Sequence, residues 1–160
     1  MNNFTNSDGA QLQAEGLALA YDRQRIIQDL DLQLPAGKIS VIIGPNGCGK
    51  STLLRALAGL LKPQTGQILL DGRALARFGA RELAKRLGLL PQSSSAPAGI
   101  SVADLVARGR FPHQGLLRQW SAEDAAAVSE ALRLTDLTAL AERPVAQLSG
   151  GQRQRVWLAL

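Results

Sequence analysis

Apolar and polar positions alternate along two early stretches of the chain. Residues 17–21 (LALAY) and 30–34 (LDLQL) place an apolar side chain at nearly every second position, which is typical of a strand with one buried face. The stretch 39–43 (ISVII) is almost wholly apolar and rich in β-branched residues. It predicts a strand buried on both faces. A turn at 35–37 (PAG) separates the last two segments.

Further apolar segments follow a glycine-rich stretch. Leucines between positions 53 and 61 fall at helical spacing, and they predict an amphipathic helix. Residues 67–72 read as a strand that closes in a turn. Residues 80–86 predict a helix and residues 87–90 a short strand. Together these segments predict an α/β core over about 11–97.

The pattern becomes helical after about residue 98. Residues 101–106 and 121–134 predict two helices, each starting with a serine at the N-cap and an aspartate three residues later. Residues 137–142 predict a third, shorter helix. We therefore expect a helical subdomain over about 98–150, and a final apolar helix that begins within 148–160.

Composition narrows the class of protein. The chain has 160 residues, 46% hydrophobic and 19% charged, which is typical of a globular domain. Its formal net charge of +5 comes from scattered basic residues that form no dense run, so we expect no nucleic-acid partner. The single cysteine, Cys48, excludes an internal disulfide framework and a cysteine-based zinc cluster. The polar N-terminal residues have no apolar h-region, so we expect no secretory signal and a reducing, cytoplasmic location.

The glycine-rich stretch 44–52 (GPNGCGKST) meets the pattern G-x-x-x-x-G-K-[ST]. In this pattern the glycines let backbone N–H groups turn toward a phosphate, the lysine supplies a positive charge, and the serine hydroxyl ligates Mg²⁺. A strand before the stretch and a helix after it fit the mechanism, and no dinucleotide fingerprint G-x-G-x-x-G is present. The predicted phosphate-binding residues are Gly44, Pro45, Asn46, Gly47, Cys48, Gly49, Lys50, Ser51 and Thr52.

Cys48 lies inside this stretch and has two interpretations. Its thiol could be reactive, since N–H groups and Lys50 make the loop electropositive. It could also be a small residue that merely fits, and we favour this interpretation because phosphate binding requires nothing of that side chain.

A second helix start has the residues of an anion site. In 148–152 (LSGGQ), Ser149 and two glycines place a hydroxyl and free N–H groups at a helix N-terminus. Two such helix starts with one phosphate loop make sense if the second completes the nucleotide pocket of another copy. Sequence therefore predicts binding in trans through Ser149, Gly150, Gly151 and Gln152.

With these two motifs, the chain resembles the ATP-binding subunit of ABC transporters. The resemblance implies a P-loop NTPase core with an antiparallel β edge and a helical subdomain, with ATP and Mg²⁺ as cofactors. It identifies 44–52 as the Walker A loop and 148–152 as the signature loop. It also implies that Tyr21 stacks on adenine, and that Gln92 is the Q-loop glutamine, which contacts Mg²⁺ together with Ser51 and faces the permease.

Two segments narrow the resemblance within this family. Residues 106–113 (VARGRFPH) and 147–157 (QLSGGQRQRVW) resemble ATPases that import iron–siderophore complexes, of the ferric enterobactin type. Cobalamin and haem importers share much of the pattern and remain alternatives. The resemblance implies a homodimer on the cytoplasmic face of the bacterial inner membrane, bound to permease subunits through the Q-loop and helical subdomain, with a periplasmic binding protein acting indirectly. ATPases of this type that act on nucleic acid or ribosomes generally carry long insertions or duplicated cassettes, and neither is visible here.

Family members continue past the signature helix into a strand that ends in Asp and Glu, and then to a switch histidine. The sequence stops at Leu160, so we expect the Walker B Asp, the catalytic Glu and part of the core sheet to be missing. The 160-residue chain alone is then expected to be inactive in hydrolysis, and a non-catalytic fragment with weak nucleotide binding is an alternative. We also expect 39–43 to expose an apolar edge and to promote aggregation.

Overall fold

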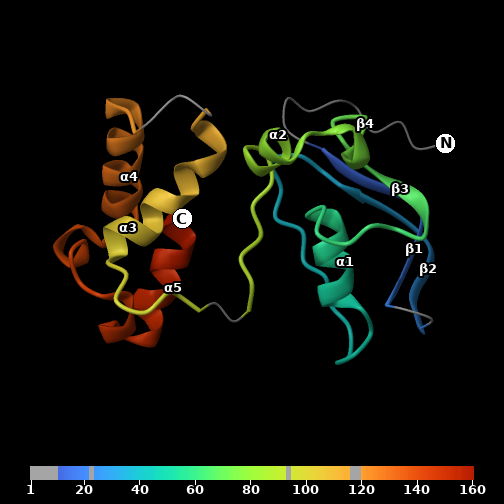
Figure 1. Cartoon of the computed structure of the whole chain (residues 1–160). Helices are drawn as coiled ribbons and strands as arrows, with labels where there is room; N and C mark the ends of the chain where they lie inside the picture. Colours follow the sequence, from blue (N-terminus) through green and yellow to red (C-terminus); the bar gives the residue numbers. More distant parts are fainter. Residues whose placement is uncertain (1–10, 22–23, 93–94, 116–119) are drawn as a thin grey trace. The chain divides into compact units, whose positions relative to one another are not determined.

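The computed structural model describes residues 11–21, 24–92, 95–115 and 120–160 (Figure 1). The chain divides into two units, Met1–Leu83 and Ala84–Leu160, and each is described by itself.

The first unit is built on an antiparallel sheet with strand order β2-β1-β3-β4. Helix α1 packs against β1, and the two share a core of buried aliphatic side chains (Figure 1). The short η1 and α2 follow the sheet. The bounds are β1 Leu12–Tyr21, β2 Gln24–Leu34, α1 Lys50–Leu57, β3 Thr65–Leu70, β4 Arg73–Ala74, η1 Leu75–Arg77 and α2 Ala80–Ala84.

Strand register follows from the alternation seen in the sequence. Leu17 and Leu19 of β1 are fully buried, as alternate residues on one face of a strand should be. Strand β1 lies close against its antiparallel neighbour β3 at Gly66, where an added Cβ would lie 2.3 Å from the Gly16 carbonyl oxygen. Only glycine permits this close backbone approach, and Gly66 also has a φ of 76°.

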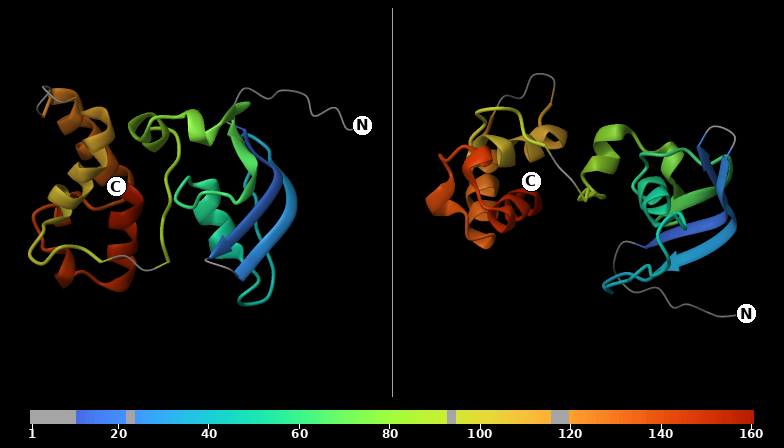
Figure 2. Two further views of the ribbon diagram at one scale, coloured as in Figure 1. Left: turned by 45° about the vertical axis from the view of Figure 1, so that its right-hand side comes forward. Right: turned by 90° about the horizontal axis from the view of Figure 1, so that it is seen from below.

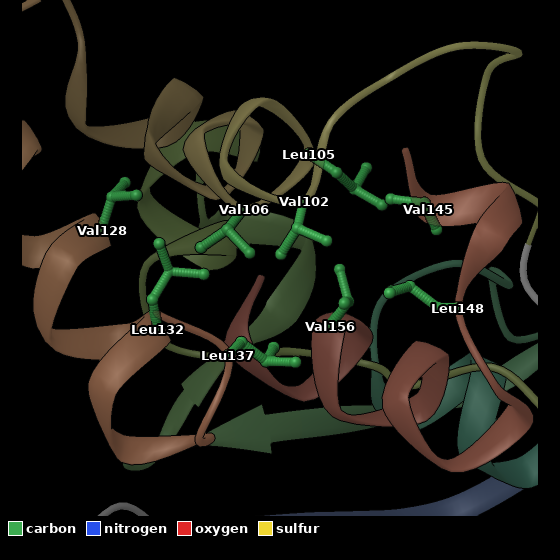
Figure 3. Close-up of a cluster of buried hydrophobic side chains, with 9 residues drawn as sticks. All are labelled: Val102, Leu105, Val106, Val128, Leu132, Leu137, Val145, Leu148 and Val156. Carbon is green, nitrogen blue, oxygen red and sulfur yellow. The ribbon is translucent and has the colours of Figure 1, made fainter. Parts of the chain in front are cut away.

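In its described residues the second unit is built of helices, with one isolated β-bridge between Ser101 and Pro144. Helices α3, α4 and α5 pack against one another, and two further views show the same arrangement (Figure 2). Side chains of these helices and of the segments between them form one core (Figure 3), made of Val102, Leu105, Val106, Val128, Leu132, Leu137, Val145, Leu148 and Val156. The bounds are α3 Val102–Ala107, η2 Arg108–His113, α4 Ala122–Leu134, η3 Thr138–Leu140, η4 Val145–Gln147 and α5 Gly150–Ala159.

A buried carboxylate joins η2 to α4. Asp124 is 4% exposed and closes a capping box with Ser121 at the start of α4. It also accepts a hydrogen bond from Arg110 Nε at 2.9 Å. The hydrogen bonds from the Ser121 side chain and then from Arg110 hold the pKa of Asp124 below its usual value of 3.8.

Most of the predicted elements are confirmed, and two strands are wrong. The strands expected at 17–21 and 30–34 are the ends of β1 and β2, and the expected helices at 101–106 and 121–134 are α3 and α4. Residues 87–90 form no strand, and the expected helix at 137–142 is only the single 3₁₀ turn η3.

The predicted strand at 39–43 is also wrong. Residues 39–43 are irregular, and Ile39, Val41 and Ile43 are 96%, 74% and 89% exposed. Their exposure agrees with the expectation that 39–43 is uncovered and apolar, but the segment does not form the edge of a strand. A buried parallel strand requires neighbours on both sides, and among the described residues every strand belongs to the antiparallel sheet.

Candidate phosphate-binding site

The loop before α1 depends on glycine at two positions. Gly47 and Gly49 have φ values of 80° and 95°, in the left-handed region that disfavours other residues. An added Cβ at Gly49 would also lie 2.7 Å from Ile26 Cγ2. Gly49 is the N-cap of α1 and offers no side chain, so the first-turn N–H groups of α1 have no side-chain acceptor at that position. These groups give the loop end a partial positive charge.

Lys50 brings a full positive charge to the same loop. Its Nζ donates hydrogen bonds to the carbonyl oxygens of Gly44 and Pro45, at 2.8 and 2.7 Å, and lies 3.7 Å from Cys48 Sγ. The ammonium is therefore folded back on the loop and held by neutral acceptors. Phosphate oxygens are stronger, charged acceptors that can replace these carbonyls.

Ser51 and Thr52 have different environments. Among the described residues the exposed hydroxyl of Ser51 makes no hydrogen bond, whereas Thr52 is 9% exposed and lies on the buried side of α1. The described part of the chain contains no group of three or more His, Cys, Asp or Glu residues placed to hold a metal ion. A Mg²⁺ ion here would thus be held through phosphate oxygens, water and Ser51, which is how this ion is commonly bound.

The second predicted helix start caps itself. Ser149 Oγ accepts from the Gln152 N–H at 3.3 Å, and Gln152 Oε1 accepts from the Ser149 N–H at 2.9 Å. This is a complete capping box. Gly150 and Gly151 are exposed, so the N–H groups beside the box lie at the surface.

The two remaining predicted site residues are Tyr21 and Gln92. Tyr21 is the last residue of β1, and its backbone pairs with Gln24, but its side chain lies outside the described part of the structure. Gln92 is exposed and belongs to the second unit. The first unit therefore carries 44–52, and the second carries Gln92 and 148–152.

Sequence analysis used the arginines after the signature loop only for the family resemblance and did not predict their contacts. Arg153 Nη2 donates to the Leu148 carbonyl at 3.1 Å, and Arg155 contacts the end of α4 through Thr135 and Asp136. The partners of Arg155 lie 19 and 20 positions away, so no local pattern indicates them. The available signal was a pair of basic residues two and four positions after Gly151.

Comparison with known proteins defines the class. The chain belongs to the ABC transporter family, whose profile matches residues 27–160. This confirms the resemblance found in the sequence, and the α/β fold with its antiparallel sheet and helical part.

The individual relatives are ATP-binding subunits. The achromobactin transport ATP-binding protein CbrD of Dickeya dadantii is 55% identical over 144 residues, covering 90% of this chain and 54% of that protein. The ferric enterobactin transport ATP-binding protein FepC of Escherichia coli is 47% identical, with 94% and 56% covered. The hemin import ATP-binding protein HmuV of Pseudomonas putida is 45% identical, with 92% and 56% covered. The chain thus spans about half the length of the curated relatives it matches.

A solved structure agrees with these relatives. An inward-facing structure described as a metal-chelate type ABC transporter superposes with a TM-score of 0.76 at 34% identity, covering 94% of this chain and 54% of that one. Among the described residues, no helix combines the length and the apolar character needed to cross a membrane.

Proposed function

We propose that the chain binds MgATP at the loop 44–52 and the N-terminus of α1. The observation that carries this proposal is Lys50 folded into a loop whose helix lacks a side-chain cap. The phosphates would take the N–H groups of the loop and of α1, and Lys50 would move from the carbonyls to their oxygens. In this proposal Ser51 and Gln92 ligate Mg²⁺, and Tyr21 stacks on the adenine.

A second copy completes the nucleotide site in this proposal. Ser149, Gly150, Gly151 and Gln152 would contact the phosphates held by the partner copy, which makes the assembly a homodimer. The exposed glycines at the start of α5 support this role, because N–H groups at a helix N-terminus attract anions.

In the whole protein, ATP hydrolysis would drive import of an iron–siderophore complex through a membrane permease. The identities of 55% and 47% to achromobactin and ferric enterobactin subunits support this substrate class. Gln92 and the helical subdomain (98–150) would contact the permease at the cytoplasmic face of the inner membrane, with a periplasmic binding protein acting indirectly. Import of haem is a second candidate, supported by the 45% identity to a hemin import subunit.

Nucleotide binding is tested first with Lys50→Ala. We expect calorimetry to show MgATP binding by the 160-residue chain, and a loss of about 10- to 100-fold in affinity for Lys50→Ala, since hydrogen bonds to charged groups contribute roughly 1.5–3 kcal/mol. Lys62→Ala, at an exposed lysine outside the loop, is the matched control and should bind like the original chain. Equal affinities of the Lys50 and Lys62 variants would contradict the proposal.

Substrate class is tested in the organism. Disruption of the gene should abolish growth on a ferric siderophore as the sole iron source and leave growth on haem unchanged. The opposite result would favour the haem alternative, and growth on both would contradict a role in iron import.

A further inference from the structure

One arginine joins α5 to the C-terminal end of α4. Arg155 Nη1 donates to the Thr135 carbonyl at 3.2 Å and lies 3.1 Å from Oδ2 of Asp136, whose carbonyl oxygen is 3.4 Å away. Thr135 is the C-cap of α4, where the helix dipole concentrates partial negative charge. The guanidinium of one helix therefore neutralises the end of its neighbour.

Asp136 stands where a helix ending of this kind favours glycine. Its φ is 55°, in the left-handed region. The Leu137 N–H reaches the Leu132 carbonyl at 2.8 Å and the Asp136 N–H reaches the Arg133 carbonyl at 3.2 Å, which is the pattern of a Schellman motif. Glycine would fill this position with less strain, so the backbone alone does not explain an aspartate. Its side chain is 94% exposed, and among the described residues its carboxylate contacts only Arg155.

Arg155 lies on the same helix as the signature loop. Six residues separate it from Ser149, or about 9 Å along the helix axis. Val156 anchors α5 through fully buried apolar packing, which is not directional. Hydrogen bonds from Arg155 add a directional restraint on the rotation of the helix about its axis.

We propose that Asp136 and Arg155 form a latch that sets the rotation of α5 and so positions the N–H groups of Gly150 and Gly151 for the phosphates held by a second copy. Both are positioning residues, because neither belongs to the loop 148–152 that is proposed to contact the phosphates. The inference rests on the proposed function, since it assumes that the signature loop contacts phosphate. The ordinary alternative is an exposed ion pair that contributes only a little to stability.

The substitution Asp136→Gly separates the two explanations. Glycine should leave the melting temperature of the chain unchanged or raise it, because it releases the strain of the positive φ. Amide hydrogen exchange at Gln152 and Arg153 should nevertheless become two- to fivefold faster, the size expected from loss of one exposed ion pair. Asp136→Asn retains an oxygen acceptor, so its exchange rates should lie between those of the original chain and those of Asp136→Gly.

Glu130→Gln is the matched control, since it removes an exposed ion pair with Arg133 on α4 that does not involve α5. It should leave exchange at Gln152 and Arg153 unchanged. Exchange in Asp136→Gly that equals the original chain, or that rises evenly through the second unit, would overturn the latch.

A functional measurement completes the test. Sedimentation in MgATP should show association of two copies weakened two- to fivefold by Asp136→Gly, while MgATP binding by a single copy stays the same. Unchanged association would count against the latch. If the original chain neither binds MgATP nor associates, the proposed function fails, and hydrogen exchange still decides whether the latch exists.

Discussion

The N-termini of α1 and α5, the two helix starts predicted to contact phosphate, differ in how their N–H groups are capped. Helix α1 follows Gly49, which has a left-handed backbone and offers no side chain to cap it. Helix α5 follows Ser149, whose side chain closes a capping box with Gln152. The first helix start therefore has no side-chain acceptor for its N–H groups, whereas in the second the Ser149 and Gln152 N–H groups are already paired and those of Gly150 and Gly151 lie at the surface.

Charge sharpens this difference. Lys50 places an ammonium within the loop before α1, while the first turn of α5 contains no charged side chain before Arg153. The α1 start is thus suited to hold an anion by itself. The α5 start offers a preformed but neutral surface, which suits a contact made only after the anion is already bound elsewhere.

The largest expected effect comes from adding one methyl group at each helix start. Gly49→Ala should destabilise the first unit by about 2–3 kcal/mol, since alanine is strained at a φ of 95° and its Cβ meets Ile26. Gly150→Ala should leave stability unchanged or raise it by up to about 1 kcal/mol, because no atom lies within 4 Å of the added Cβ. Urea unfolding of both variants measures this. Equal losses would show that the two starts do not differ.

Local sequence patterns correctly predicted the strands that pair with a neighbour adjacent in the sequence. The alternation in 17–21 and 30–34 reports one buried face, and an antiparallel neighbour adjacent in sequence supplies the pairing. The run at 39–43 has the composition of a buried strand, but composition does not say whether neighbours are present. This is why that prediction is wrong while β1 and β2 are confirmed.

The candidate site also has features that a local pattern predicts and contacts that it does not. The loop 44–52 and the serine caps were predictable because each acts over a few residues of its own segment. The capping box at 121–124 was visible, but the third partner, Arg110, was not, since it lies 14 positions from Asp124. Contacts between distant segments leave no periodic signal, and only the folded unit brings them together.

Removal of the Ser149 cap should have the next largest effect. Ser149→Ala should destabilise the second unit by about 1 kcal/mol, because the Gln152 N–H loses its side-chain acceptor. Binding of MgATP by a single copy should not change, since the cap does not belong to α1. Thermal unfolding and calorimetry on the same sample measure both quantities. A loss of nucleotide affinity without a loss of stability would contradict the division of roles between the two helix starts.

A pH titration compares two capping boxes of the second unit. The box of α4 depends on the carboxylate of Asp124, whose pKa is lowered, so its stabilisation is complete above about pH 4 and is lost as the pH falls through the lowered pKa. The box of α5 uses the neutral amide of Gln152 and should not respond. The effect should be smaller than loss of a cap, because a protonated carboxyl still accepts hydrogen bonds. Asp124→Asn should flatten the response between pH 5 and 3 relative to the original chain, measured by unfolding at each pH; an unchanged slope would assign the response to other groups.

The smallest expected effect is at Cys48, the one side chain of the α1 site with two open interpretations. Serine has nearly the same shape and can accept from Lys50 as the sulfur does, so Cys48→Ser should bind MgATP within about twofold of the original chain. The Lys50→Ala change made in the Cys48→Ser chain should still lose its affinity. A tenfold loss in Cys48→Ser alone would mean that the thiol takes part in binding. The open helix start would then depend on a side chain, as α5 does, and no longer on backbone and Lys50 alone.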